Sequence, residues 1–343
     1  MTTLRKFKLL AILAFVLAIP AGAQNCNCKT AFAWVKQTFE ENDAGFQFVI
    51  DRRGEQAYAI HNQLIAERIK TATNKQECAE IIIDWLHFFR TGHIGFGVFD
   101  SNEGDIMQEF LASLVTEPPY LKRLNETTLY FRIPSFVITE RAKIDSILNA
   151  NRNNFMRTQN LIIDLRGNSG GSDDAWWKLF TFISSNPVVL RSLYFRSTEL
   201  NNQVFREFDK NFYNRLNDNL GEFVLLHNQR YITISNYHQG NPRHVGIIVD
   251  RYVGSATESF LLLARQSRRV KLFGEPTAGV FDISNMNVTE SPCRSFVLFY
   301  ALSKGVDIDR FPIDGIGIQP DFFLGGMPDY EWVDFVNDIL NRR

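Results

Sequence analysis

The sequence predicts an α/β fold, and two strand–loop–helix units with the same layout carry this prediction. In the first unit, an apolar run at residues 161–165 precedes a glycine-rich loop and a helix expected from about residue 173 to 184. In the second, the apolar residues 245–249 lead through a turn carrying Ser255 into a helix expected from about residue 257 to 266. Buried strands that alternate with helices are typical of a parallel sheet with helices on its faces.

The remaining chain divides into three parts. Residues 24–95 are predicted as a helical subdomain, because apolar residues recur at helical spacing. Its expected elements are helices at 31–41, 57–71 and 76–90 and a strand at 46–50. Residues 96–127 are expected to be a connector and residues 128–343 the α/β domain. Within the latter we expect strands at 127–133, 270–273 and 295–301, a helix from 144 towards 156, and a closing helix at 328–340.

Composition places the chain among ordinary globular proteins. Of its 343 residues, 45% are hydrophobic and 22% are charged, and the formal net charge is −1. The absence of a basic stripe argues against a nucleic-acid partner. The thirty phenylalanines indicate either a bulky core or an aromatic groove, and composition does not separate the two.

The first 23 residues have the pattern of a signal peptide. Arg5, Lys6 and Lys8 precede a short apolar run at residues 9–19, and Ala21-Gly-Ala23 fits a cleavage site after Ala23. The run is too short to span a bilayer comfortably. We therefore expect a secreted or periplasmic protein with no stable membrane insertion, carrying 34 basic and 38 acidic residues after cleavage.

Four cysteines are available for disulfides in an oxidising compartment, namely Cys26, Cys28, Cys78 and Cys293. Cys26 and Cys28 are too close in sequence to bridge easily, so one of them is expected to pair with Cys78. A zinc site is the weaker alternative, because no second close pair exists. No metal or organic cofactor is expected.

Two glycine-rich segments are candidate functional loops. Gly92, Gly95 and Gly97 surround His93, although a lone histidine is more often structural. The loop from Arg166 to Gly171 can direct backbone N–H groups at a ligand. It lacks the glycine pattern and the Gly-Lys-Ser/Thr ending of phosphate loops, which favours an oxyanion-binding role. The polar residues 195–243 either cover a cleft or form a surface excursion.

Ser255 and Asp314 each have a structural and a catalytic interpretation. Ser255 lies between an apolar strand and a helix start, a suitable place for a nucleophile. Ser255-Ala-Thr-Glu258 is also a capping box, in which Glu258 is a cap or structural acid. Asp314-Gly315 is by itself a turn signal.

Three ordered segments resemble the tail-specific (C-terminal processing) serine peptidase family. They are Asp164-Leu-Arg-Gly-Asn-Ser-Gly-Gly171, Ser255-Ala-Thr-Glu-Ser259 with Gly274-Glu-Pro-Thr-Ala-Gly279, and Asp314-Gly-Ile-Gly-Ile-Gln-Pro-Asp321. Thr91-Gly-His93 resembles the histidine motif of the branch with the tricorn core and the interphotoreceptor retinoid-binding repeats. The resemblance implies a ClpP/crotonase-like catalytic domain. Thr127 follows His93 by only 34 positions, which leaves no room for a PDZ module.

The resemblance also implies the site. Ser255 would be the nucleophile, His93 the general base and Asp314, where the branch usually has glutamate, the residue that orients the imidazole. The backbone N–H groups of Gly170 and Ala256 would form the oxyanion hole. The lysine base of other members falls on Val280, which accepts no proton. With a histidine base of ordinary pKa, activity should fall as pH drops through about 6.5.

These observations predict an exported serine peptidase that hydrolyses peptides or proteins through an acyl-enzyme. A non-catalytic binder of an apolar ligand or peptide is the alternative on the same fold. An esterase or amidase is a third possibility, although the G-x-S-x-G elbow of the α/β-hydrolases is missing. The sequence does not indicate an oligomeric state.

Overall fold

The computed structural model describes residues 26–99, 106–237 and 239–342. The expected signal segment, residues 1–23, lies outside them. The larger part of the molecule is built on a six-stranded sheet in the order β13-β10-β9-β4-β3-β2. Its strands are β2 (Tyr120–Arg123), β3 (Thr128–Arg132), β4 (Asn160–Asp164), β9 (His244–Val249), β10 (Val270–Gly274) and β13 (Phe322–Phe323). All neighbours are parallel except β2, which is antiparallel to β3, so the predicted α/β class is confirmed.

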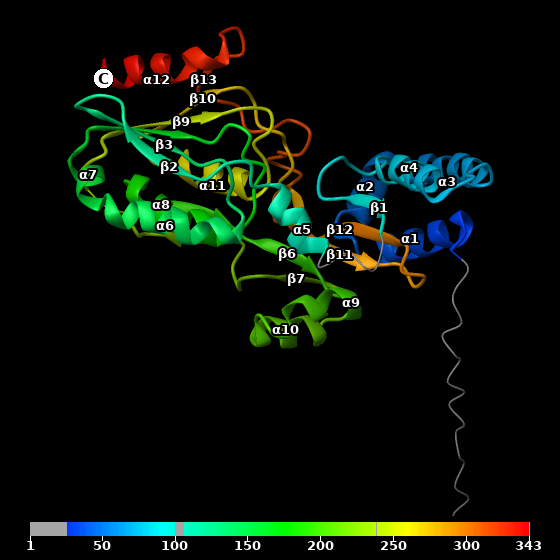
Figure 1. Ribbon diagram of the computed structural model, residues 1–343. Coiled ribbons are helices and arrows are strands. Elements are labelled where there is room, and N and C mark those ends of the chain that lie inside the picture. The colour runs from blue at the N-terminus through cyan, green and yellow to red at the C-terminus, as the bar shows by residue number, and fades with distance from the viewer. Residues whose placement is uncertain (1–25, 100–105, 238, 343) are drawn as a thin grey trace, which may run out of the picture.

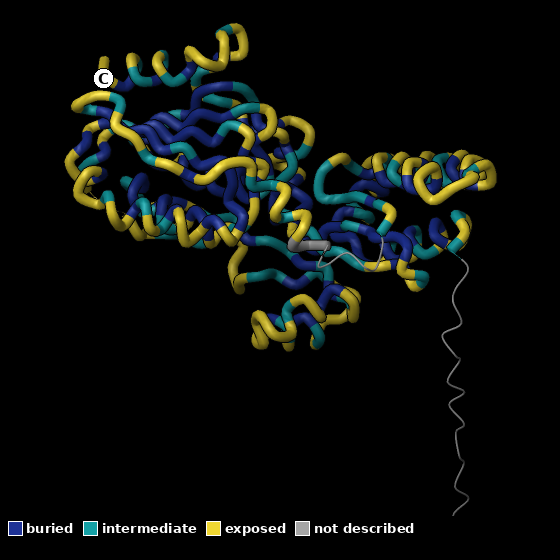
Figure 2. The backbone as a smooth tube through the Cα atoms, in the orientation of Figure 1, coloured by how far each residue is buried: buried dark blue, intermediate teal, exposed yellow. Residues whose placement is uncertain are grey.

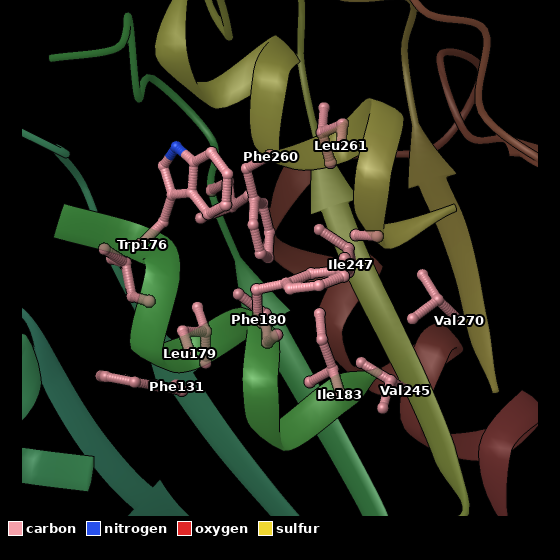
Figure 3. Close-up of a cluster of buried hydrophobic side chains, with 14 of the residues drawn as sticks. Phe131, Trp176, Leu179, Phe180, Ile183, Val245, Ile247, Phe260, Leu261 and Val270 are labelled. Atoms are coloured by element: carbon pink, nitrogen blue, oxygen red, sulfur yellow. The ribbon is translucent and has the colours of Figure 1, made fainter. Parts of the chain in front are cut away.

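Helices cover both faces of this sheet (Figure 1). They are α6 (Arg141–Ala150), α7 (Arg152–Arg157), α8 (Asp173–Ile183), α11 (Ala256–Ala264) and α12 (Trp332–Asn341), with the short 3-10 turns η1 (Ile138–Glu140) and η3 (Asp329–Glu331). Figure 3 shows Trp176 and Phe180 of α8 and Phe260 of α11 packed together beside Ile247 of β9. On the opposite face, α12 packs Val336 and its neighbours against the sheet. Burial on both faces explains why all of β4 and nearly all of β9 are inaccessible.

A second sheet joins the N-terminal helices to the main body. Its strands are β1 (Gly95–Val98), β6 (Leu193–Arg196), β7 (Phe223–Leu225), β11 (Ile283–Glu290) and β12 (Phe296–Gly305). The helices beside it are α1 (Cys28–Asn42), α2 (Phe46–Arg53), α3 (Glu55–Ile69) and α4 (Lys75–Leu86). Their apolar faces share one hydrophobic cluster with β12. Buried residues run through both the part built on the main sheet and the part built on the second sheet, and exposed residues are most frequent along the outer helices and loops (Figure 2).

Shorter elements complete the described chain. They are α5 (Ile106–Ser113), β5 (Val188–Arg191), α9 (Glu199–Asn202), η2 (Gln203–Phe205), α10 (Lys210–Asn217) and β8 (Tyr231–Ile234). None of the helices in the described ranges is long and apolar enough to cross a membrane.

Two local expectations differ from the structure. Residues 46–50 were expected to be a strand but begin α2, because Phe46, Val49 and Ile50 fall on one side of a helix and pack into the N-terminal cluster. The segment 96–127, expected to be a connector, contains most of β1 and all of β2. β2 pairs with β3 across the expected boundary at residue 128.

Both disulfides tie the N-terminal helices to their surroundings. Cys28 pairs with Cys78, which confirms the expected bridge from the Cys26/Cys28 pair to Cys78. Cys26 pairs with Cys293, at the turn between β11 and β12. The start of α1 is therefore fixed to both α4 and the second sheet.

Candidate active site

Ser255 lies in the turn between β9 and α11, at the carboxyl end of a central strand. Its backbone has φ 55° and ψ −124°, a conformation that non-glycine residues rarely adopt. The Glu258 side chain helps to hold it, since Oε2 accepts a hydrogen bond from the Ser255 N–H at 3.1 Å. The other carboxylate oxygen accepts from Thr277 Oγ1 at 2.5 Å and Gly279 N at 2.9 Å. Glu258 therefore acts as a structural acid that joins two loops.

The structure brings His93 to this hydroxyl. The imidazole Nε2 lies 2.9 Å from Ser255 Oγ, although 162 positions separate the two residues in the chain. His93, in the loop between α4 and β1, also has a positive φ of 52°. Its Nδ1 is buried and has no hydrogen-bond partner among the described residues.

The surroundings of His93 keep its ring neutral. Burial, followed by the positive charge of Arg90, lowers the pKa of His93 to about 4, with the Ile283 backbone and Asp43 partly opposing them. This differs from the ordinary value expected from the sequence. A neutral imidazole whose Nε2 faces Oγ can accept the hydroxyl proton at physiological pH.

Gly170 lies directly against Ser255, but its N–H is already engaged. A β-carbon there would lie 2.7 Å from Ser255 Cβ and 3.1 Å from Ala256 N. The Gly170 N–H donates to Asn168 Oδ1 at 3.1 Å, and Asn168 also receives a hydrogen bond from Thr257. Within the described residues, the N–H groups of Gly171 and Ala256 have no acceptor. The sequence placed the loop donor at Gly170, whereas the donor left free in this conformation belongs to Gly171.

Asp314 does not hydrogen-bond to His93 in this structure. Its Oδ1 accepts from the N–H groups of Phe281 and Asp282 at 2.6 and 2.7 Å. In the opposite direction, Asp282 Oδ2 accepts hydrogen bonds from the N–H groups of Ile313 and Asp314. The two aspartates thus join two loops by exchanging backbone hydrogen bonds. Burial and the charge of Asp282 raise the pKa of Asp314 to about 6.

Val280, where the sequence resemblance aligns the lysine base of other members, lies between the His93 loop and the Ser255 loop. A β-carbon at Gly92 would lie 2.4 Å from Val280 Cγ1, and one at Gly254 would lie 2.7 Å from Cγ2. Two glycines therefore contact this side chain, one before His93 and one before Ser255. The contact packs the two loops against each other.

Ser255 and His93 open into a cavity of about 1860 Å³. Ala256 and Gly171 lie in the same wall. Other parts of the wall are apolar, with contributions from Phe96, Phe110, Phe195, Val204, Phe208, Leu226, Phe281, Met286, Val288 and Phe299. Several of these belong to residues 195–243, which favours the interpretation of that segment as part of a cleft. The volume exceeds that of most small-molecule pockets and suits a stretch of peptide.

Nothing in the described part of the chain forms a metal centre, since no three His, Cys, Asp or Glu side chains are grouped to hold an ion. The residues gathered at Ser255 are instead those of acyl transfer: a hydroxyl, a neutral imidazole and free backbone N–H groups. Sequence reasoning missed Asn168, which engages the Gly170 N–H. Its place two residues before Gly170, where an Asx side chain commonly bonds the backbone, was an available signal.

Comparisons with known proteins find several solved structures with a similar fold. Mature CPAF complexed with lactacystin is 12% identical, with 92% of this chain and 97% of that chain covered and a TM-score of 0.62. A lipoprotein from Streptococcus agalactiae is 16% identical, with 92% and 97% covered and a TM-score of 0.57. The photosystem II D1 C-terminal processing protease is 11% identical, with 90% and 97% covered and a TM-score of 0.50. These likenesses show a shared fold.

A search of curated proteins found no match to the sequence. The model of peptidase family S41 matches residues 127–324. This segment runs from the start of β3 to the end of β13 and includes Ser255, both loops around it and Asp314. Because the match spans more than half of the chain, the protein belongs to peptidase family S41, the tail-specific serine peptidases.

Proposed function

We propose that this protein is an exported peptidase that cleaves peptide or protein substrates through an acyl-enzyme on Ser255, with His93 as the general base. The observation that carries this proposal is the 2.9 Å contact between His93 Nε2 and Ser255 Oγ. The signal pattern of residues 1–23 and the two disulfides support export, because disulfides persist in oxidising compartments.

The proposed reaction follows from the positions of these groups. Ser255 Oγ attacks the substrate carbonyl while His93 Nε2 takes its proton, giving a tetrahedral oxyanion and an imidazolium. The imidazolium then gives the proton to the leaving amine as the C–N bond breaks. Water, deprotonated by the same nitrogen, hydrolyses the ester and returns the enzyme to its starting state.

The oxyanion is proposed to bind at the start of α11 and the glycine loop. The Ala256 N–H is the first N–H of the helix and carries the favourable dipole of its N-terminus. The second donor is proposed at Gly171, whose N–H is free, and not at Gly170, whose N–H is held by Asn168.

Asp314 is proposed to orient His93 through the chain between them. Its carboxylate holds the N–H groups of Phe281 and Asp282, and the backbone of the next residue, Ile283, interacts favourably with the protonated His93. Asp314 would then be a positioning residue that acts through the 281–283 backbone, and not a direct partner of Nδ1.

A non-catalytic binder is the second candidate, favoured by the large apolar cavity. A fluorophosphonate probe separates the two functions, because it modifies only an activated serine. We expect the mature protein to be labelled at Ser255 and Ser255→Ala to lose both labelling and peptide hydrolysis. Ser259→Ala is the matched control, since Ser259 also lines the cavity but hydrogen-bonds Asp173. An unlabelled wild-type protein would support the binder, and labelling of Ser255→Ala would place the nucleophile elsewhere.

A further inference from the structure

Arg90 holds the backbone on both sides of the catalytic histidine. Its Nε donates to Gly92 O at 3.0 Å, and its Nη2 donates to His93 O at 3.2 Å. These two carbonyls belong to the peptide groups before and after His93, so one guanidinium restrains both peptide planes. The Arg90 side chain is 8% exposed, which limits competition from water for these hydrogen bonds.

Asp43 fixes Arg90 in turn. Its carboxylate oxygens accept from Arg90 Nη1 at 2.8 Å and Nη2 at 2.5 Å, a bidentate arrangement. The same oxygens accept from Gly45 N at 2.8 Å and Ala301 N at 2.9 Å. The Asp43 side chain is completely buried and is thus attached to the α1–α2 turn and to β12. The Asp43–Arg90 pair therefore connects the N-terminal helices and the second sheet to the His93 loop.

His93 needs such support because its backbone conformation is unfavourable. A positive φ at a residue with a β-carbon persists only where the surrounding structure imposes it. The described hydrogen bonds to the two carbonyls flanking His93 come from Arg90. Without them, the loop can relax to a commoner conformation, which would move Nε2 away from Ser255 Oγ.

We propose that Arg90, held by Asp43, is a positioning residue that keeps His93 in reach of Ser255 and touches neither the substrate nor the reacting atoms. This inference rests on the proposed function, in which His93 is the base. Lysine cannot replace arginine here, because a single ammonium cannot span a bidentate carboxylate and two carbonyls in one plane. The prediction is a specific loss of chemical rate without a loss of ligand binding.

Arg215 provides a matched control in the same chain. It donates to the carbonyls of Leu225 and Leu226 at 2.5 and 3.1 Å and lies over the Phe212 ring. Arg90 likewise lies over the ring of Phe39. Both arginines thus donate to two carbonyls and lie over a phenylalanine ring, but only Arg90 reaches the His93 loop and also pairs with the buried carboxylate of Asp43. Arg215→Lys therefore controls for the loss of the carbonyl and ring contacts, and the stability of both variants is measured so that only folded proteins are compared.

The test measures the maximal inactivation rate (kinact) and the apparent affinity (KI) for one fluorophosphonate probe, at a temperature where every variant is folded. A 1 Å displacement of a catalytic group can cost on the order of 100-fold in rate, so we expect Arg90→Lys to lower kinact by about that factor. KI should be the same in Arg90→Lys as in the wild type, because Arg90 does not contact the bound probe. Asp43→Asn should also lower kinact, while Arg215→Lys should leave it at the wild-type value.

Three outcomes would overturn the inference: wild-type kinact in folded Arg90→Lys, an equal loss in Arg215→Lys, or a change in KI alone. If Arg90→Lys does not fold, Asp43→Asn decides the question by the same two constants. A wild-type protein that the probe does not label at Ser255 would instead contradict the proposed function itself. Failure of the inference and failure of the function therefore give different results.

Discussion

His93 and Ser255 are in hydrogen-bond contact, Nε2 to Oγ at 2.9 Å, although 162 positions separate them in the chain. Both residues have positive φ angles, 52° and 55°, so the contact joins two strained loops. Each loop is held by a charged side chain, Glu258 at the Ser255 loop and Arg90 at the His93 loop.

The acid limb of activity should lie near pH 4. His93 is a base only when neutral, and its pKa is lowered to about 4, so the labelling rate should stay constant from neutral pH downwards and be lost as pH falls through about 4. A pH profile of labelling with an uncharged probe measures this. A limb near 6.5, the ordinary histidine value, would contradict the buried environment of the ring.

A control is needed because Asp173 also lies in the cavity wall. Burial raises the pKa of Asp173 to about 6, so this carboxyl changes charge between pH 4 and pH 6.5. Asp314, the proposed positioning residue for His93, also has a pKa of about 6. The profile should therefore be repeated with Asp173→Asn and with Asp314→Asn, and a limb near pH 4 in all three proteins assigns it to His93.

Gly170→Ala should abolish labelling, whereas Gly167→Ala should not. Both glycines have positive φ, 117° and 74°. A β-carbon at Gly170 would collide with Ser255 and with the Gly254 carbonyl at 3.0 Å, while one at Gly167 meets nothing within 4 Å. Gly167→Ala should therefore show only the cost of its backbone conformation, about 1–2 kcal/mol. Equal effects of the two substitutions on labelling would show that the close approach at Gly170 is unimportant.

Asp314→Asn should change stability in a pH-dependent way. The pKa of Asp314 is raised to about 6 in the folded protein, so the stability from its bound proton is present below about 3.8, the ordinary value, and is lost as pH rises through about 6. Asparagine keeps an oxygen for the Phe281 and Asp282 N–H groups but carries no charge. The melting temperature of the variant relative to wild type should thus be more favourable at pH 8 than at pH 4. An equal difference in melting temperature between variant and wild type at pH 4 and pH 8 would contradict this prediction.

Removing the Cys28–Cys78 disulfide should destabilise the protein without removing the active site. The two cysteines are 50 positions apart, for which the chain-entropy model gives about 4 kcal/mol. We expect Cys28→Ser/Cys78→Ser to lower the free energy of unfolding by about that amount in urea. Labelling at 25 °C should persist, because the Asp43–Arg90 pair is still present. Unchanged stability would mean that the unfolded chain gains little freedom from losing the bridge.

The main sheet could be predicted from the sequence because short stretches of neighbouring residues identify its central strands. The runs at residues 161–165 and 245–249 are apolar throughout, as strands covered on both faces must be, and each is followed by a helix. The error at residues 46–50 arose because a five-residue apolar segment fits either a strand or a helix. β2 was missed since Tyr120–Arg123 is short and lies largely exposed at the sheet edge.

The site was predictable only in part, because local motifs identify Ser255 and His93 but not the distant residues that hold them. The motifs around Ser255 and His93 indicated a nucleophile and a base, and the structure places these two side chains together. The supporting groups depend on distant partners. Asp43 contacts Arg90 across 47 positions and Ala301 across 258, and no local pattern reports such pairings.

The position of Val280 has a consequence for how this active site can change. The two methyl groups of Val280 lie between Gly92 and Gly254, where neither loop has space for a side chain of its own. A lysine at position 280 would need more volume than this space provides. Val280→Lys alone should therefore push these two loops apart. Because the same loops carry His93 and Ser255, a longer side chain at position 280 would lengthen the distance between the imidazole and the hydroxyl.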